Sequence, residues 1–158
     1  MPERYIKKIL DARVYDVAIE SPVNQARNLT RRFGNNIFLK REDLQPVFSY
    51  KLRGAYNKIS RLSDEQKAKG VIAASAGNHA QGVALAATRL GIHATIVMPR
   101  TTPEIKVNSV RDSGAEVVLI GDAFDEAAAY AQEQIETYGY TYIHPYDDPD
   151  TIAGQGTV

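Results

Sequence analysis

Strand-like and helix-like segments alternate regularly between residues 71 and 143, and this alternation constrains the fold more than any other feature of the sequence. Short runs with the length and residue types of buried strands lie at 71–74, 94–98, 116–120 and 140–143. The segments between them are predicted to be helices, at 78–90, 103–113 and 122–138. Because apolar strands joined through helices are typical of parallel βαβ units, we predict an α/β fold whose parallel sheet is covered on both faces.

The remainder of the chain is less regular. We predict an amphipathic helix at 4–12, strand or irregular structure at 24–32, a strand at 37–41 and a helix at about 50–61. The residues predicted to cap helices are Ser63, Thr102, Asp122 and Asp148. The helix that Asp148 begins has barely started when the chain ends at Val158, so we expect the chain to be part of a longer protein.

The composition excludes several classes of protein. Nineteen basic and nineteen acidic side chains give a formal net charge of zero, so no global field attracts nucleic acid or an acidic membrane. The absence of cysteine excludes disulfides and thiolate metal sites. No apolar run has the length needed to span a bilayer. We therefore expect a cytoplasmic protein with no nucleic-acid or membrane partner.

Lys51 stands at the first turn of the helix predicted at 50–61. That helix carries an apolar stripe with helical spacing, formed by Leu52, Ala55, Tyr56, Ile59 and Leu62. Lys51 lies on the flank of the stripe, so its amine can reach inward from a packed helix. The alternative is a lysine whose ammonium group extends into solvent.

A second candidate site is the loop Ser75-Ala76-Gly77-Asn78-His79, which follows a predicted strand and begins a predicted helix. The first amides of a helix lack intrahelical partners and lie at the positive end of the helix dipole, an arrangement that binds phosphate, sulfate or carboxylate. An ordinary N-cap by Ser75 or Asn78 is the alternative. His79 is either an acid/base group or a histidine packed under the loop.

Two acidic pairs, Glu42-Asp43 and Asp147-Asp148, are candidates for binding a cation, but we expect each to be a solvated loop. No two histidines are spaced for a metal, and we predict no metal site.

A lysine at a structured turn and an anion-binding loop one βα unit downstream together suit an aldehyde cofactor. An unperturbed lysine is almost entirely protonated at pH 7 and is a poor nucleophile, but it gains a role when it is held as an imine. Pyridoxal phosphate is such an aldehyde and serves as an electron sink for a carbanion at an amino acid's Cα. The released lysine can remove the Cα proton while the loop holds the substrate's carboxylate.

Three stretches resemble the threonine dehydratases (threonine ammonia-lyases) in amino-acid sequence, order and spacing. They are KREDLQPVFSYKLRGAY at 40–56, ASAGNHAQGV at 74–83 and IAGQGT at 152–157. The amino-acid sequence at 40–47 is more similar to the biosynthetic, isoleucine-pathway branch than to the catabolic one. The resemblance implies a fold-type II pyridoxal-phosphate enzyme that converts L-threonine to 2-oxobutanoate and ammonia, with L-serine as a secondary substrate.

The resemblance also implies roles for individual residues. Lys51 would form the imine with the cofactor, Phe48 or Tyr50 would pack near the cofactor ring, and Asn78 would hydrogen-bond its ring oxygen. The residues that would bind the substrate, mainly by its carboxylate, are Ser75, Ala76, Gly77, Asn78 and His79. Relatives that racemise serine carry a second serine at the position of Ala76, so we predict elimination without efficient racemisation.

The implied domains are an incomplete large domain at 1–53, a small α/β domain at 54–150 and a return to the large domain at 151–158. The full-length protein would be a homotetramer. In relatives, the glycine-rich loop for the cofactor phosphate lies beyond the residue that matches Val158. We therefore expect residues 1–158 alone to have negligible activity and no stable cofactor, which a cofactor absorbance band that survives desalting would contradict.

Other functions remain open at this point. One is a different fold-type II lyase, such as a serine dehydratase or a threonine synthase. Another is a non-catalytic, flavodoxin-like module whose loop at 75–82 binds a phosphate or nucleotide, which leaves Lys51 without a role. The third is an inert folded subdomain.

Overall fold

The computed structural model describes residues 2–158 and is organised around a four-stranded sheet. The order of the strands is β5–β4–β3–β6, and all of these pairings are parallel. The strands are β3 (Val71–Ala74), β4 (Ala94–Met98), β5 (Glu116–Leu119) and β6 (Thr141–Tyr142). The predicted α/β fold with a parallel sheet is thereby confirmed.

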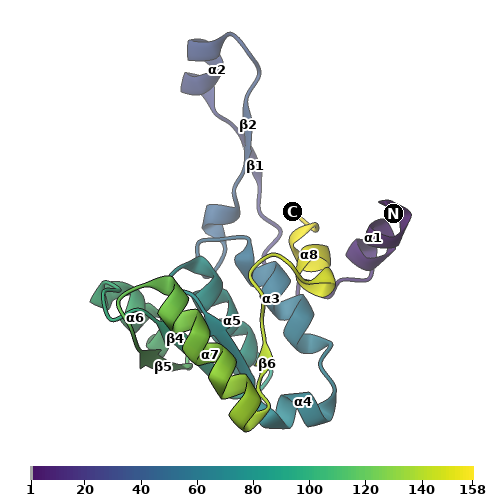
Figure 1. Cartoon of the computed structure of the whole chain (residues 1–158). Helices are drawn as coiled ribbons and strands as arrows, with labels where there is room; N and C mark the ends of the chain where they lie inside the picture. Colours follow the sequence, from purple (N-terminus) through teal and green to yellow (C-terminus); the bar gives the residue numbers. More distant parts are fainter. Residues whose placement is uncertain (1) are drawn as a thin grey trace.

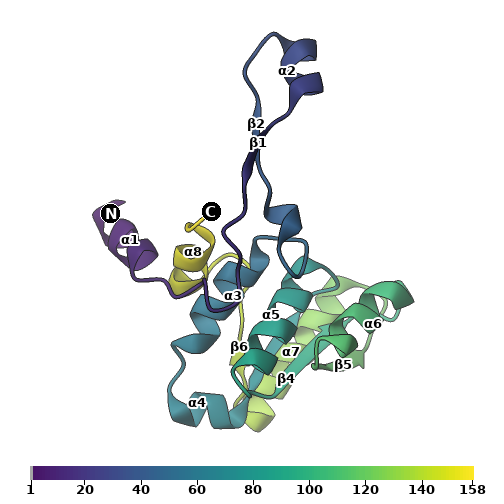
Figure 2. The ribbon, with the colours of Figure 1, turned by 180° about the vertical axis from the view of Figure 1, so that it is seen from behind.

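Helices cover both faces of this sheet (Figures 1 and 2). Neighbouring residues of a strand point to opposite faces. Val71 accordingly packs in one apolar cluster with α5 and α6, and Ile72 packs in another with α7. The covering helices are α5 (Asn78–Arg89), α6 (Glu104–Asp112) and α7 (Phe124–Tyr138). No helix within residues 2–158 is long and apolar enough to cross a membrane.

Helix α3 (Lys51–Ser60) packs against α5 on one side and against α8 (Pro149–Gln155) on the other (Figure 1). It crosses α8 at two glycines. A Cβ at Gly154 would lie 2.5 Å from the carbonyl oxygen of Arg53 and 2.8 Å from the Cα of Gly54. The two helices can therefore approach this closely only because both positions are glycine.

Two further helices flank α3 along the chain. Helix α1 (Pro2–Leu10) lies near α8 in both ribbon views, and α4 (Asp64–Lys69) follows α3 directly. The capping box predicted at Ser63 and Gln66 is present at the start of α4.

A two-stranded ribbon carries a short helix away from the body of the molecule (Figures 1 and 2), and we call residues 22–41 the arm. Strand β1 (Val23–Gln25) pairs antiparallel with β2 (Phe38–Lys40), and α2 (Arg27–Phe33) lies at the far end. The prediction of strand or irregular structure at 24–32 is therefore wrong for most of that segment. Helix α2 buries no side chain, so no apolar periodicity marks it in the sequence.

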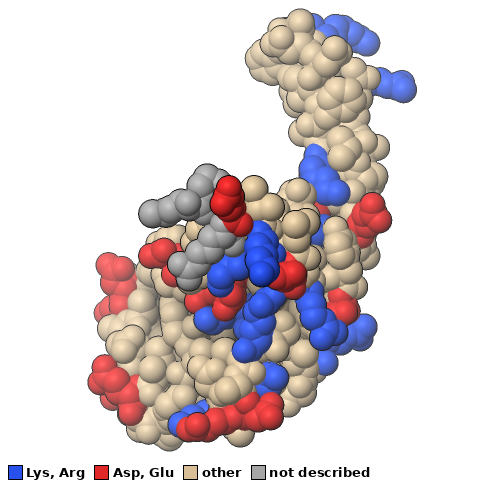
Figure 3. All heavy atoms as spheres, turned by 90° about the vertical axis from the view of Figure 1, so that its right-hand side faces the viewer, with Lys and Arg blue, Asp and Glu red and all other residues tan. Residues whose placement is uncertain are grey.

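The arm has a distinct surface. Its exposed large apolar side chains are Val23, Leu29, Phe33, Phe38 and Leu39. Residues 22–41 include lysine and arginine but no aspartate or glutamate, and Figure 3 shows basic side chains on the arm where the body mixes both signs.

Two predicted helix caps are displaced by one residue. Pro103 rather than Thr102 is the N-cap of α6, and Ala123 rather than Asp122 is the N-cap of α7. Glu126 replaces the expected aspartate cap, because its carboxylate accepts hydrogen bonds from the amides of Asp122 and Ala123 at 2.6 and 3.0 Å.

Beside α3, a short 3₁₀ helix, η1 (Glu42–Leu44), joins the arm to the loop that precedes Lys51.

Candidate active site

Lys51 is the first residue of α3, and its side chain is half-buried. Its Nζ donates a hydrogen bond to the carbonyl oxygen of Pro145 at 2.6 Å and lies 5.5 Å from the centre of the Tyr50 ring. Residues 143–145 follow β6, so the amine stands at the carboxyl end of the parallel strands. Open α/β sheets bind their ligands at this edge.

The loop before α3 has an unusual backbone conformation. Phe48 has a φ of 54°, which residues with a side chain seldom adopt. The hydroxyl of the buried Ser49 accepts a hydrogen bond from the amide of Lys51 at 3.2 Å. Such strain persists only where the surroundings hold it, and it clusters at functional sites. The Phe48 side chain is 75 % exposed, and it is the Tyr50 ring that lies beside the lysine amine.

Helix α5 packs directly against the first turn of α3. A Cβ at Gly82 would lie 3.1 Å from the backbone nitrogen of Leu52, so only a glycine fits here without displacing that turn. Within the loop that precedes α5, the Ser75 hydroxyl accepts a hydrogen bond from the Gly77 amide at 3.3 Å. Asn78 is exposed, and nothing lies within 4 Å of the position of a Cβ at Gly77, so the loop is open on this side.

His79 is packed under this loop. It is 4 % exposed, and its Nε2 donates a hydrogen bond to the carbonyl oxygen of Ile143 at 2.7 Å. Burial, together with the nearby charge of Lys51, lowers the pKa of His79 to about 4, so the ring is neutral at pH 7. Its buried Nδ1 has no hydrogen-bond partner within residues 2–158. This geometry favours the packed histidine over the acid/base group.

The three stretches singled out in the sequence converge on residues 143–145. Lys51 from the first stretch and Gln155 from the third both donate to the Pro145 carbonyl oxygen, at 2.6 and 3.0 Å. His79 from the second stretch donates to Ile143. Segments far apart in the sequence thus surround one point at the edge of the sheet.

The neutral His79 predicts a pH dependence of stability. As the pH falls from 7 to 4, the unfolded chain binds a proton on this histidine that the folded chain does not bind. The free energy of unfolding should therefore fall by about 3 kcal/mol from this group alone. His79→Gln, which keeps a donor for Ile143 but does not titrate, should remove that part of the slope. Urea unfolding at pH 7 and pH 4 measures the fall in the free energy of unfolding for the unaltered chain and for His79→Gln. An equal fall in the two proteins would contradict the assignment of a lowered pKa to His79.

In each of the acidic pairs predicted at Glu42-Asp43 and Asp147-Asp148, one carboxylate forms an ion pair within the fold. Glu42 is buried and forms an ion pair with Arg53, whose Nε lies 2.7 Å from Oε2, so the expectation of a solvated loop is wrong for this carboxylate. Asp148 caps α8 and pairs with the Nζ of Lys58 at 2.7 Å. Their sequence neighbours Asp43 and Asp147 are exposed. In the part of the chain that the structure describes, no three histidine or acidic side chains are grouped to hold a metal ion.

Comparison with known proteins agrees with this geometry. The family described as "Pyridoxal-phosphate dependent enzyme" matches residues 14–158, and the chain belongs to that family. Within it, the chain is similar to biosynthetic threonine dehydratases. It is 60 % identical over 154 residues to "Threonine dehydratase 1 biosynthetic, chloroplastic" of Solanum lycopersicum, covering 98 % of this chain and 25 % of that protein.

The chain is also similar to solved structures. The processed form of threonine deaminase isoform 2 from Solanum lycopersicum superposes with a TM-score of 0.94 at 59 % identity, over 98 % of this chain and 45 % of that one. Maize serine racemase superposes with a TM-score of 0.91 at 37 % identity, over 96 % of this chain and 47 % of that one. The fold-type II architecture and the resemblance to biosynthetic threonine dehydratases are confirmed, and the chain spans about a quarter of the length of the curated relative.

The residues present fit the aldehyde end of pyridoxal phosphate. Lys51 offers an amine at the sheet edge, the Tyr50 ring lies beside it, and the neighbouring loop is open at Gly77 and Asn78. The orphaned Nδ1 of His79 is a buried polar atom of the kind that marks functional sites.

Proposed function

We propose that this chain supplies the cofactor-binding lysine and the substrate-binding loop of a threonine dehydratase. The enzyme would convert L-threonine to 2-oxobutanoate and ammonia, the first step towards isoleucine, and would accept L-serine as a secondary substrate. The convergence of Lys51, His79 and Gln155 on residues 143–145 carries the proposal. Similarity to relatives named as biosynthetic threonine dehydratases supports the choice of substrate.

The proposed mechanism assigns one task to each part of the site. Pyridoxal phosphate supplies, when bound, an electron sink for negative charge at the amino acid's Cα. Lys51 would hold the cofactor through Nζ, and the same amine would serve as the base that accepts the Cα proton. The carbonyl oxygen of Pro145 orients this amine through the 2.6 Å hydrogen bond. Ser75, Gly77 and the first amides of α5 hold the substrate's carboxylate at the positive end of the helix dipole.

The remaining site residues complete the pocket in this proposal. The exposed Asn78 would hydrogen-bond the cofactor's ring oxygen, and Ala76 lines the loop with a small side chain. Phe48 and Tyr50 are the aromatic candidates beside the cofactor ring, and the position of the Tyr50 ring, 5.5 Å from Lys51 Nζ, favours Tyr50. His79 supports the loop from beneath through Ile143.

We also propose the domain division 1–53, 54–150 and 151–158, with the first and last parts in a larger domain. The boundary falls inside α3. Its later residues Tyr56 and Ile59 belong to the apolar cluster of the sheet, whereas Arg53 contacts Glu42 and Thr157 outside the sheet. A cytoplasmic homotetramer is proposed for the full-length protein, although the plant relative is named as chloroplastic. Light scattering after size exclusion tests the tetramer.

Turnover by a full-length polypeptide containing this chain tests the function. We expect 2-oxobutanoate to form from L-threonine faster than pyruvate forms from L-serine at equal subsaturating concentrations. A preference for serine would favour a serine dehydratase, and phosphate release from O-phosphohomoserine would favour a threonine synthase. Either result would overturn the proposal.

Ala76 leads to a prediction about the type of reaction. A methyl side chain cannot donate or accept a proton on the second face of the cofactor, so the full-length protein should eliminate water from L-serine without forming D-serine at a comparable rate. Ala76→Ser introduces a hydroxyl at this half-buried position and should raise D-serine formation. Chiral chromatography of the products measures both rates. Rapid D-serine formation by the unaltered protein would contradict the prediction.

A further inference from the structure

Arg53 is a fully buried arginine on the first turn of α3, two residues after Lys51. Its Nε and Nη2 donate side by side to Oε2 and Oε1 of Glu42, at 2.7 and 2.9 Å. Nη2 also donates to the carbonyl oxygen of Ile19 at 3.3 Å, and Nη1 donates to the hydroxyl of Thr157 at 3.2 Å. A planar guanidinium bonded at two atoms to one carboxylate has little freedom to turn.

The partners of Arg53 are themselves held in place. The Glu42 carboxylate accepts hydrogen bonds from the Ser21 hydroxyl at 2.6 Å and from Nε2 of Gln45 at 3.2 Å. Gln45 binds the backbone of Ile19 through both its amide atoms, at 2.9 and 2.8 Å. Burial raises the pKa of Glu42, but the hydrogen bonds from Arg53, Ser21 and Gln45 outweigh burial and leave it below its ordinary value. The carboxylate is therefore charged at neutral pH.

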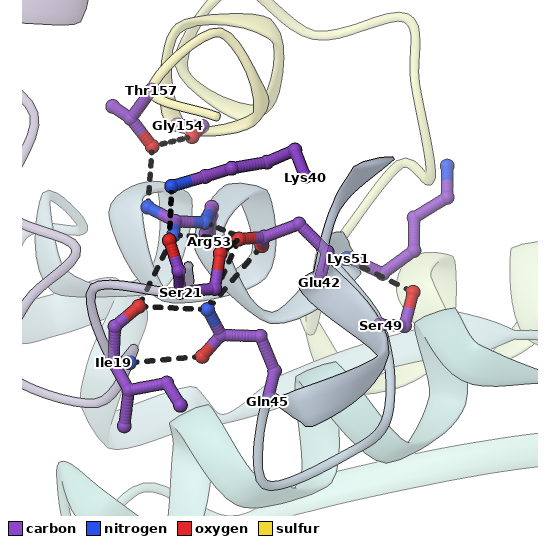
Figure 4. A network of polar contacts seen from close by, with 10 residues as sticks. All are labelled: Ile19, Ser21, Lys40, Glu42, Gln45, Ser49, Lys51, Arg53, Gly154 and Thr157. Carbon is purple, nitrogen blue, oxygen red and sulfur yellow. Dashed lines mark hydrogen bonds and ion pairs between the residues drawn. The ribbon is translucent and has the colours of Figure 1, made fainter. Parts of the chain in front are cut away.

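This network joins three segments to the turn that carries Lys51. They are residues 19–21, residues 42–45 and Thr157, which follows α8 (Figure 4). The strained loop with Phe48 runs from Gln45, which belongs to the network, to Lys51. Both ends of that loop are thereby anchored.

Lys51 and Arg53 point in opposite directions from the same helical turn. Residues two apart in an α-helix are separated by about 200° around the axis. Figure 4 shows the Arg53 side chain within the network and the Lys51 side chain directed away from it. Holding Arg53 therefore fixes the rotation of this turn about the axis of α3, and with it the direction of the lysine.

We propose that Arg53 and Glu42 form a positioning pair that directs the Nζ of Lys51 to the Pro145 carbonyl oxygen at the edge of the sheet. Stability alone explains the pair poorly, because apolar side chains of similar volume often replace a buried ion pair without loss of stability. The catalytic consequence rests on the proposed function, but the direction of the lysine can be measured without a cofactor.

Trace acetylation with acetic anhydride, followed by peptide mapping, reports the direction of the lysine. In the unaltered chain Lys51 is half-buried and hydrogen-bonded, so it should react more slowly than the exposed Lys106 on α6. The double variant Glu42→Leu/Arg53→Met removes the directional bonds without leaving an unpaired charge, and it should remain folded by circular dichroism. The ratio of Lys51 to Lys106 acetylation should then rise about fivefold or more, since the released amine reaches solvent.

Two further variants make the result decisive. Arg53→Lys keeps the charge opposite Glu42 but not the paired bonds, so it should give an intermediate ratio, and it decides the matter if the double variant does not fold. Arg61→Met removes an exposed arginine at the other end of α3 and should leave the ratio unchanged. An unaltered ratio in a folded double variant, or in Arg53→Lys, would overturn the positioning pair.

A parallel reaction separates this inference from the proposed function. Full-length polypeptides that contain the unaltered chain or the double variant are treated with pyridoxal phosphate and borohydride. If the unaltered chain shows no preference for Lys51, the proposed function fails, while the acetylation ratios still test the positioning pair. If pyridoxal phosphate labels Lys51 preferentially in the unaltered chain but not in the double variant, the proposed function and the positioning pair are both supported.

Discussion

Replacement of Lys51 by methionine in a full-length polypeptide that contains this chain is expected to lower threonine deamination at least about 10³-fold. The variant removes the amine that we propose both to bind the cofactor and to accept the Cα proton. The fold should survive, because the Pro145 carbonyl oxygen keeps its hydrogen bond from Gln155 at 3.0 Å. The rate of 2-oxobutanoate formation at saturating threonine measures the loss.

Lys106→Met is the matched control for this variant. Lys106 is an exposed lysine of α6. Its replacement should leave both the rate and the circular dichroism spectrum unchanged. A Lys51→Met protein that keeps more than a tenth of the activity would show that another residue performs the chemistry.

Gly154→Ala is expected to lower the free energy of unfolding of this chain by about 2 kcal/mol, and its melting temperature by about 4–8 °C. The added methyl group would lie 2.5 Å from the carbonyl oxygen of Arg53 and 2.8 Å from the Cα of Gly54. Both obstacles are backbone, so α8 has to move away from α3. Thermal unfolding followed by circular dichroism measures the change.

Gly156→Ala on the next turn of the chain is the control for this crossing. Its Cβ would lie 2.7 Å from Cδ1 of Ile9, which is the tip of a flexible side chain and can rotate away. The cost should therefore stay below about 1 kcal/mol. Equal losses in the two variants would show that the glycine crossing is not what holds α3 against α8.

The sheet could be predicted because each of its signals is local. The residues of β3 and β4 are short buried runs, apolar except for Thr95, and they match the structure from Val71 to Ala74 and from Ala94 to Met98. Helix α2 could not be predicted from apolar periodicity, since none of its side chains is buried. Gly34, which ends α2 in the left-handed conformation, is the one signal that could have indicated it.

The candidate site was predictable only in part. Lys51 and the loop at 75–79 lie within contiguous motifs, so the sequence alone singles them out. Pro145 and the pair of Glu42 with Arg53 depend on packing between segments that are distant in the sequence, and they were missed. The sequence does carry a signal for the pair of Glu42 with Arg53. Arg53 stands among the small and apolar residues of a predicted helix, and an arginine buried there requires a buried counter-charge.

Reductive trapping with pyridoxal phosphate tests whether Lys51 is the residue that binds the cofactor. A full-length polypeptide that contains this chain is mixed with the cofactor, reduced with borohydride and digested, and the modified peptides are identified by mass spectrometry. We expect the pyridoxyl group to be confined to Lys51, whose amine is held at the edge of the sheet. Labelling scattered over exposed lysines such as Lys106, with no excess at Lys51, would overturn the assignment of Lys51 and favour a phosphate-binding module.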